Sequence, residues 1–215
     1  MNRKRPLCGS CKKPLTTCIC RYLVNIEHNI EVIVWRHPSE SKNAKNTADL
    51  LKMCLANCRI EDGEVFSPER LAIENGRCAL LYPGGKLLES SSVHAGKAQF
   101  TQLLLIDGTW RKSRKILHLN PWLAHMPCYT FNSVSSAYRI RKAEQNGQLS
   151  TFEAGALALR FLENDGMIER SLMAVFEKFV GCWEDFVPTS VLETDKGGKF
   201  GRESKVICPN QTERN

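Results

Sequence analysis

The chain has 215 residues, enough for one substantial domain and a small appendage. Hydrophobic residues make up 42% of it and charged residues 25%, as in an ordinary soluble globular protein. It has no apolar run of membrane-spanning length and no apolar stretch behind its cationic N-terminus, so we expect no membrane span, no signal peptide and a cytoplasmic location. The net charge of +7 favours a polyanionic partner without identifying it.

Four cysteines crowd the first part of the chain. Cys8 and Cys11 form a CxxC pair, and Cys18 and Cys20 form a tighter CxC pair. In a reducing compartment such a cluster favours a metal over disulfides, and four thiolates suit tetrahedral zinc. We therefore expect residues 1–25 to form a module with a structural Zn2+. The alternative is a loose basic arm that carries reduced cysteines.

A strand ended by a proline is predicted over residues 31–38. His37 lies at its end, where a lone histidine is more often structural than catalytic. Asn46 or Thr47 then caps a helix that is predicted over residues 48–57.

Two later segments share one pattern, a buried strand that ends in a glycine-bearing turn. Residues 78–82 precede Pro83-Gly84-Gly85, and residues 103–106 precede Asp107-Gly108. A continuous apolar run is typical of a strand buried on both faces, and ligands of open α/β sheets bind at this end of the strands.

A helix opens directly behind the second turn, with Thr109 and Trp110. One interpretation is a functional site, and the other is that Asp107 or Thr109 caps the helix while Trp110 belongs to the core. Arg111 and Lys115 share one face of this helix. Such a basic stripe either binds an anion or is a solvated surface.

The remaining elements follow from periodicity and composition. They are a short strand over 129–131, a helix over 150–162, an amphipathic helix over 169–186 and a flexible tail over 191–215. Between them, Arg139 and Arg141 lie on one face of a segment that alternates basic and apolar residues. Ser150 and Glu153 form a capping box, which explains both residues structurally.

The segment Asp107-Gly108-Thr109-Trp110 resembles the signature of the DTW-domain family, whose members resemble tRNA-uridine aminocarboxypropyltransferases. Further segments match the family in order over residues 8–186. These are the four cysteines, His37-Pro38-Ser39-Glu40 with Asn46-Thr47, Leu81-Tyr82-Pro83-Gly84, Tyr138-Arg139-Ile140-Arg141-Lys142 and Leu149-Ser150-Thr151-Phe152-Glu153-Ala154.

The resemblance implies an α/β fold, a SPOUT-like sheet with a C-terminal trefoil knot, for a catalytic domain over residues 26–190. Pattern alone predicts an ordinary open sheet, because knots are rare. The cofactor, S-adenosylmethionine, would lie in the loops of the knot. Its implied contacts are Leu81, Tyr82, Pro83, Gly84, Ile106, Asp107, Gly108, Ile140, Thr151, Glu153 and Ala154.

The implied reaction transfers the 3-amino-3-carboxypropyl group of S-adenosylmethionine to the imide nitrogen of a tRNA uridine, in the variable loop, and releases methylthioadenosine. Asp107, Thr109 and Trp110 are the implied catalytic residues. Asp107 either deprotonates or orients the imide, and Trp110 stacks on the base or walls the pocket.

The implied contacts to RNA and substrate are His37, Arg111, Lys115, Tyr138, Arg139 and Arg141. Two alternatives remain open, a methyltransferase of the same fold and a non-catalytic zinc-containing RNA-binding protein. The partner that the resemblance implies is tRNA, and we expect no membrane and no obligate protein partner.

Overall fold

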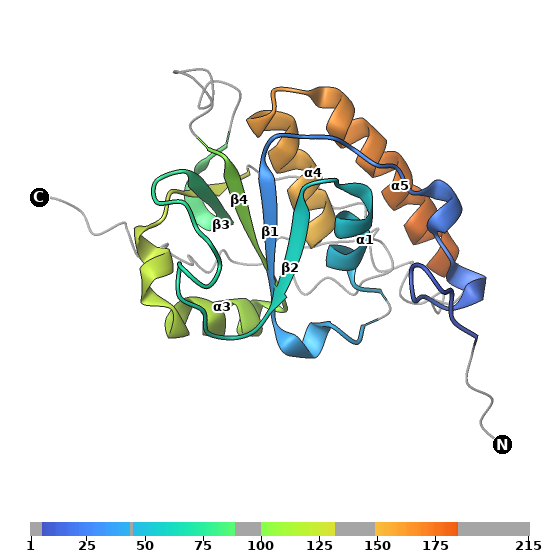
Figure 1. Cartoon of the computed structure of the whole chain (residues 1–215), viewed down its shortest axis with the longest axis horizontal. Helices are drawn as coiled ribbons and strands as arrows, with labels where there is room; N and C mark the ends of the chain where they lie inside the picture. Colours follow the sequence, from blue (N-terminus) through green and yellow to red (C-terminus); the bar gives the residue numbers. More distant parts are fainter. Residues whose placement is uncertain (1–5, 44, 89–99, 132–148, 185–215) are drawn as a thin grey trace, which may run out of the picture.

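The computed structural model describes residues 6–43, 45–88, 100–131 and 149–184. Its centre is a five-stranded sheet in the order β2-β1-β4-β3-β5, in which every neighbouring pair is parallel (Figure 1). The strands are β1 (Glu31–Arg36), β2 (Cys58–Asp62), β3 (Cys78–Leu87), β4 (Gln102–Asp107) and β5 (Cys128–Thr130). The expected α/β class is thus confirmed.

Helices cover both faces of this sheet. On one side lie α1 (Thr47–Cys54), α4 (Thr151–Leu162) and α5 (Gly166–Glu184), and α3 (Trp110–Leu119) lies on the other (Figure 1). Among the described residues, no helix is both long and apolar enough to cross a membrane.

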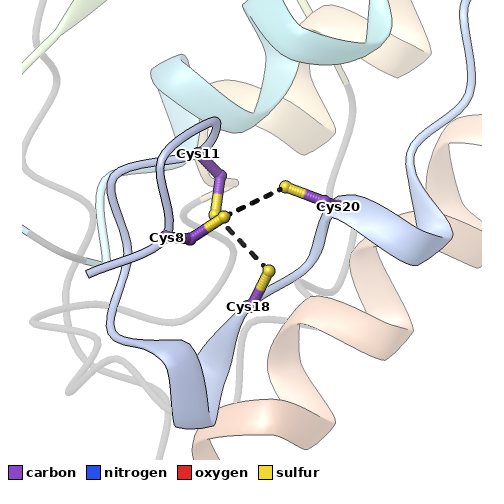
Figure 2. A group of neighbouring side chains, drawn as sticks. All are labelled: Cys8, Cys11, Cys18 and Cys20. Atoms are coloured by element: carbon purple, nitrogen blue, oxygen red, sulfur yellow. Dashed lines mark hydrogen bonds between the residues drawn. The ribbon is translucent and has the colours of Figure 1, made fainter. Parts of the chain in front are cut away.

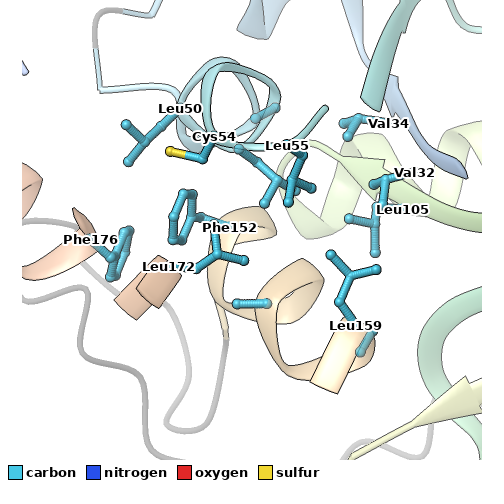
Figure 3. Packing of buried hydrophobic residues seen from close by; sticks show 14 of the residues in the cluster. Val32, Val34, Leu50, Cys54, Leu55, Leu105, Phe152, Leu159, Leu172 and Phe176 are labelled. Atoms are coloured by element: carbon cyan, nitrogen blue, oxygen red, sulfur yellow. The ribbon is translucent and has the colours of Figure 1, made fainter. Parts of the chain in front are cut away.

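Successive side chains of the central strands β1 and β4 point alternately into two hydrophobic cores, one on each face of the sheet. Val32 and Val34 of β1 and Leu105 of β4 pack with Phe152 and Leu159 of α4 (Figure 3). The intervening residues of the same strands, such as Ile33 and Leu104, face the core under α3. Burial on both faces explains why these strands read as unbroken apolar runs.

The helix α4 begins where the sequence predicts it. Ser150 Oγ accepts a hydrogen bond from Glu153 N at 3.2 Å, and the Glu153 carboxylate accepts one from Ser150 N at 2.7 Å. The capping box is therefore confirmed. Helix α5 follows over Gly166–Glu184, close to the predicted range of 169–186.

The predicted end of the first helix was wrong. Helix α1 ends at Cys54, because the segment before β1 takes over the hydrogen bonds that would extend it: Ile26 N donates to Cys54 O, and Ala56 N donates to Ile26 O. Cys58 then begins β2, an edge strand that the sequence analysis did not identify. The predicted knot loop around Ile140 and the predicted tail lie outside the described residues, so the knot and the tail stay predictions.

Candidate active site and metal centre

The candidate active site lies at the carboxyl edge of the sheet, where β1 ends at Arg36 and β4 ends at Asp107. These two residues are partners in the parallel register, and His37 N donates a hydrogen bond to Asp107 O at 3.0 Å. The helices α1, α3 and α4 begin at this edge. In open parallel sheets this edge is the one that receives ligands.

Asp107 is buried at the junction of β4, α1 and α4, with a relative exposure of 8%. Thr151 Oγ1 donates to Oδ1 at 2.6 Å, and Asn46 Nδ2 donates to Oδ2 at 2.8 Å. Asn46 Oδ1 in turn caps α1 by accepting from Ala48 N at 2.8 Å. Burial raises the pKa of the Asp107 carboxyl, and the hydrogen bonds from Thr151 and Asn46 act against that rise.

The alternative interpretation, in which Asp107 or Thr109 caps a helix, does not describe this turn. Thr109 occupies the N-cap position of α3 but makes no side-chain capping hydrogen bond, and the Asp107 carboxylate binds Asn46 and Thr151 instead. Trp110 is half-buried and packs against the core under α3.

Arg36 fixes the end of β1 beside Asp107. Its guanidinium is buried and bonds to both oxygens of Asp62, at 2.6 and 2.9 Å, and to Asp49 at 2.8 Å. These pairs tie β1 to β2 and α1. Because Asp62 and Asp49 neutralise the charge of Arg36, the Asp107 carboxylate is stabilised mainly by its own hydrogen-bond donors, Asn46 and Thr151. The sequence carried no local signal for this cluster.

Tyr82 of β3 and Trp110 of α3 meet on the α3 side of the same edge. Their rings lie edge to face, with centroids 6.0 Å apart, and Tyr82 OH is 3.2 Å from Ser113 Oγ. Tyr82 itself is buried, so its ring positions Trp110 from the core.

The predicted turn after Leu81 is a distortion within a longer strand. β3 pairs with β4 only up to Leu81, and its pairing with β5 shifts register between Leu81 and Lys86. Gly84 has a φ of +87°, which favours glycine, and a Cβ on Gly85 would lie 2.6 Å from the backbone of Cys128. The glycines thus allow β3 to leave β4 at the carboxyl edge, but the strand does not end there.

His37 belongs to a network of charged side chains at this edge. Its Nε2 lies 2.7 Å from Glu64 Oε1, and Lys115 Nζ bonds to Glu64 Oε2 at 2.5 Å. Lys112 Nζ bonds to Glu40 at 2.6 Å. The basic stripe of α3 is therefore partly matched by carboxylates. Arg111 is exposed and forms no ion pair with any residue that the structure describes.

The other predicted site residues have varied positions. Ile106 is partly buried against the core under α3. Gly108 lies close to the His37 side chain, because a Cβ on it would be 3.6 Å from His37 Cβ. Ala154 N donates to Ser150 O in the first turn of α4. Glu153 is held in the capping box rather than directed at the site. Four predicted residues lie outside the described ranges: Tyr138, Arg139, Ile140 and Arg141.

The four N-terminal cysteines converge on one point (Figure 2). Their sulfurs all lie within 4.8 Å of one another, with Cys8 and Cys20 3.7 Å apart and Cys11 and Cys18 3.9 Å apart. A tetrahedron of thiolates around zinc, with bonds of about 2.3 Å, has S–S edges of about 3.8 Å. The geometry therefore fits a zinc site.

The Cys8 sulfur accepts hydrogen bonds from the backbone amides of the CxxC turn. The amides of Cys11 and Ser10 lower the pKa of the Cys8 thiol to about 6. Because metals bind thiolates, this favours the ligand form of Cys8, whereas burial and the neighbouring thiols raise the pKa of Cys20.

The structure thus combines a parallel α/β sheet, a buried carboxylate at the carboxyl edge of that sheet and a four-cysteine cluster near the N-terminus. The chain belongs to the DTW domain family, which matches residues 5–183.

Several curated proteins that are similar to the chain are named tRNA-uridine aminocarboxypropyltransferases. The tRNA-uridine aminocarboxypropyltransferase 2 of Mus musculus is 31% identical over 182 residues, which make up 79% of this chain and 61% of that protein. The protein of that name from Macaca fascicularis is 29% identical over 80% of this chain and 61% of its own length. The one from Drosophila melanogaster is 28% identical over 79% of this chain and 72% of its length.

The chain thus spans 61% of the length of the two mammalian relatives. No solved structure matches the chain.

Proposed function

We propose that the protein is a tRNA-uridine aminocarboxypropyltransferase that uses S-adenosylmethionine. Membership of the DTW domain family and the names of its relatives support this activity. The observation that carries it is the Asp107 carboxylate, which is held by donors from α1 and α4 at the edge of a parallel sheet. The uridine acceptor is proposed to lie in the variable loop of tRNA.

Asp107 is suited to orient the uracil imide. Each carboxylate oxygen accepts one hydrogen bond from the protein and retains a lone pair for a substrate N–H. Because these donors come from the starts of two helices, the carboxylate is fixed before the substrate binds, which is the condition for efficient positioning. We therefore assign Asp107 the orienting role rather than that of the base.

Trp110 offers a surface on which the base could stack. It is half-buried at the first turn of α3, and its contact with Tyr82 sets the ring orientation. Base–aromatic stacking is a common means of holding an unpaired nucleotide. Thr109 lies at the same turn, beside the position of the substrate.

S-adenosylmethionine, when bound, supplies an electrophilic γ-carbon and methylthioadenosine as the leaving group. We assign its binding to the segments where β3 and β4 separate, namely Leu81–Gly84 and Ile106–Gly108, with Ile140 from the proposed SPOUT knot. Thr151 and Ala154 border the site at the start of α4, while Glu153 supports this helix start through its capping box.

The tRNA contacts proposed beyond the reacting base are mainly cationic. The exposed Arg111 is the described residue best suited to a phosphate, whereas Lys115 is paired with Glu64. Tyr138, Arg139 and Arg141 complete the set on the strength of the family pattern. The zinc module over residues 1–25 has a structural role, and the location is proposed to be the cytoplasm.

The leaving group tests the reaction directly. Protein, unmodified tRNA and S-adenosylmethionine are incubated together, and the small molecules and digested nucleosides are analysed by mass spectrometry. We expect methylthioadenosine and a uridine heavier by the aminocarboxypropyl group. S-adenosylhomocysteine with a methylated uridine would instead identify a methyltransferase. No tRNA-dependent product would favour an RNA-binding protein without catalytic activity.

A further inference from the structure

We propose that Asn46 is a positioning residue of the active site, which holds Asp107 in the ionised form and in the orientation that accept the substrate N–H. The inference rests on the proposed function and deepens it. Asn46 acts through Asp107, so the inference assigns it no contact with the substrate. Its role goes beyond the helix cap that the sequence indicates for this residue.

The side-chain amide of Asn46 is buried and fully hydrogen-bonded. The residue has a relative exposure of 6%. Its Oδ1 accepts from Ala48 N at 2.8 Å and from Asp49 N at 3.2 Å. Its Nδ2 donates to Asp107 Oδ2 at 2.8 Å and to Glu40 O at 3.5 Å. An amide oxygen has two lone pairs and an amide nitrogen two hydrogens, so these four contacts use the whole capacity of the group.

The same contacts fix which end of the Asn46 amide faces Asp107. A flip of the amide would point Nδ2, which only donates, at the backbone N–H groups of Ala48 and Asp49. It would also point Oδ1, which only accepts, at the Asp107 carboxylate. Both arrangements are repulsive. The first turn of α1 therefore holds a hydrogen-bond donor in place against Asp107 Oδ2.

The two donors to Asp107 differ in how they respond to its protonation. Thr151 Oγ1 lies 2.6 Å from Oδ1 and is a hydroxyl, which can donate to a carboxylate or accept from a protonated carboxyl. Asn46 Nδ2 can only donate, so its contact with Oδ2 is strongest when Asp107 is ionised. Burial raises the pKa of Asp107, and the hydrogen bonds from Thr151 and then Asn46 lower it. Asn46 is thus the partner that is specific for the acceptor form.

The charged groups around Asp107 do not replace this donor. Glu40 raises the pKa of Asp107, and Arg36 lowers it by less than Asn46 does. Lys112 of α3 is paired with Glu40 at 2.6 Å. The other charged groups where the adjoining elements begin or end have partners of their own: Asp49 and Asp62 bind Arg36, His37 binds Glu64, and Glu153 closes the capping box of α4.

The ionised form of Asp107 matters because the uracil imide has one N–H to donate. A charge-assisted hydrogen bond is about twice as strong as a neutral one, so a carboxylate orients this N–H better than a protonated carboxyl does. The Asn46 donor leaves lone pairs of the carboxylate for the substrate. Protonation of Asp107 should therefore weaken the orientation of the base and slow the transfer.

Two substitutions of Asn46 keep the cap of α1 and change what faces Asp107, because Asp and Ser cap helices about as well as Asn does. Asn46→Asp replaces the donor by a second carboxylate. The two backbone N–H groups favour its ionised form, so the proton stays with Asp107. Asn46→Ser has a shorter side chain, which leaves Asp107 Oδ2 without its donor. The matched control is Asn43→Asp, the same change at an exposed residue whose side chain accepts from Lys45 N at 3.0 Å.

Single-turnover rates are measured with tRNA and S-adenosylmethionine across the pH range in which each protein stays folded. The wild-type rate should fall on the acid side as Asp107 is protonated. Loss of the donor raises the pKa of Asp107, so in both Asn46 variants this fall should begin at a higher pH. We expect a shift of about one pH unit or more, because a hydrogen bond to an ionised group contributes about a factor of ten or more to an equilibrium constant. The rates should approach the wild-type rate at high pH, most slowly for Asn46→Asp.

The titration of Asp107 is also measured without substrate, by the ¹³C shift of its carboxyl carbon, which is assigned through its loss in Asp107→Asn. It should move to higher pH in Asn46→Ser and stay unchanged in Asn43→Asp. An unchanged titration in Asn46→Ser overturns the inference, whatever the protein catalyses. So does a rate loss that is equal at every pH, which indicates a structural role, or a shift of the same size in Asn43→Asp. A wild-type protein that forms no methylthioadenosine overturns the proposed function instead, so the two failures are distinguishable.

Discussion

Ionisation of the buried Asp107 carboxyl is unfavourable, and the hydrogen bonds from Thr151 and Asn46 only partly offset this effect. Burial raises the pKa of its carboxyl, because an ionised carboxylate loses water when it is enclosed. A carboxyl with a raised pKa in the fold stabilises the protein below the pKa of the unfolded chain, about 3.9 for Asp. That stability is lost as the pH rises through the folded-state value, so ionisation of Asp107 lowers the free energy of unfolding.

Asp107→Asn should therefore separate stability from activity. The amide keeps the shape of the carboxylate, can accept from Asn46 and can donate to the Thr151 hydroxyl. We expect a melting temperature at pH 7 equal to or above that of the wild type, and an advantage that shrinks towards pH 4. The single-turnover rate should fall by about 10²-fold or more, because the substrate N–H loses its acceptor.

A matched control is Asp165→Asn, which changes an exposed carboxylate that accepts a hydrogen bond from Met167 N at 2.8 Å. Asparagine caps helices as well as aspartate does, so stability and rate should change little. If Asp107→Asn keeps the wild-type rate, or is destabilised by the same amount at both pH values, Asp107 only supports the fold.

The sequence reveals the candidate site residues that belong to local motifs. It does not reveal those that only the tertiary fold places at the site. Asp107, Trp110 and the four cysteines could be proposed from the sequence because turn residues and ligand spacings are local patterns of neighbouring residues. Glu64 was missed, because its segment shows no pattern and its partners lie on β1 and α3. Asn46 was identified as a cap, but its second hydrogen bond depends on how α1 meets β4.

At the scale of elements, α4 packs closely between α1 and the sheet because of one glycine. A Cβ on Gly155 would lie 2.7 Å from Leu51 Cδ2 and 3.2 Å from Leu105 Cδ1. The close approach also brings the start of α4 to the site, where Thr151 binds Asp107. Any widening of this contact should therefore affect both packing and the carboxylate.

Gly155→Ala and Gly181→Ala form a matched pair in adjacent helices. A Cβ on Gly181 meets nothing within 4 Å, so that alanine should stabilise α5 by about 0.5–1 kcal/mol through helix propensity. At Gly155 the same gain should be exceeded by overpacking, which costs about 1–3 kcal/mol. Urea unfolding of both variants measures the difference, and equal stabilities would show that α4 adapts without strain.

The elements predicted best from the sequence are those with strong periodicity or a clear cap. Strands β1 and β4 and helices α4 and α5 have such signals. The partly buried edge strand β2 lacks a long apolar run. The end of α1 is set by the hydrogen bonds of Ile26 with Cys54 and Ala56, which no local pattern encodes. The continuation of β3 past its glycines depends likewise on pairing with β5.

At the scale of the whole molecule, the cysteine cluster and the sheet share one core. Cys11 and Ile19 are buried in the same cluster as Phe179 of α5, and Lys13 Nζ lies 4.9 Å from the centre of the Phe179 ring. A metal that fixes the cysteines therefore also fixes one side of α5. Loss of the metal should loosen this packing as well as the N-terminal turn.

We expect about one zinc per chain in protein purified without a metal-binding tag, as a four-thiolate site requires. The double variant Cys8→Ser and Cys11→Ser should lose the zinc and melt at a lower temperature. A loss of roughly 2 kcal/mol corresponds to a shift of about 4–8 °C for a chain of this size. Binding of S-adenosylmethionine below the melting point should persist, because the proposed binding segments belong to β3 and β4.

The control for this experiment is Cys182→Ser, which changes a partly buried cysteine of α5 outside the cluster. Its metal content should equal that of the wild type, so zinc loss in the double variant can be assigned to the cluster. Because Ile19 and Phe179 belong to one core, the wild type should unfold in a single transition that chelation shifts as a whole. A wild-type protein that contains no metal and keeps full stability would show that the four sulfurs converge without binding zinc.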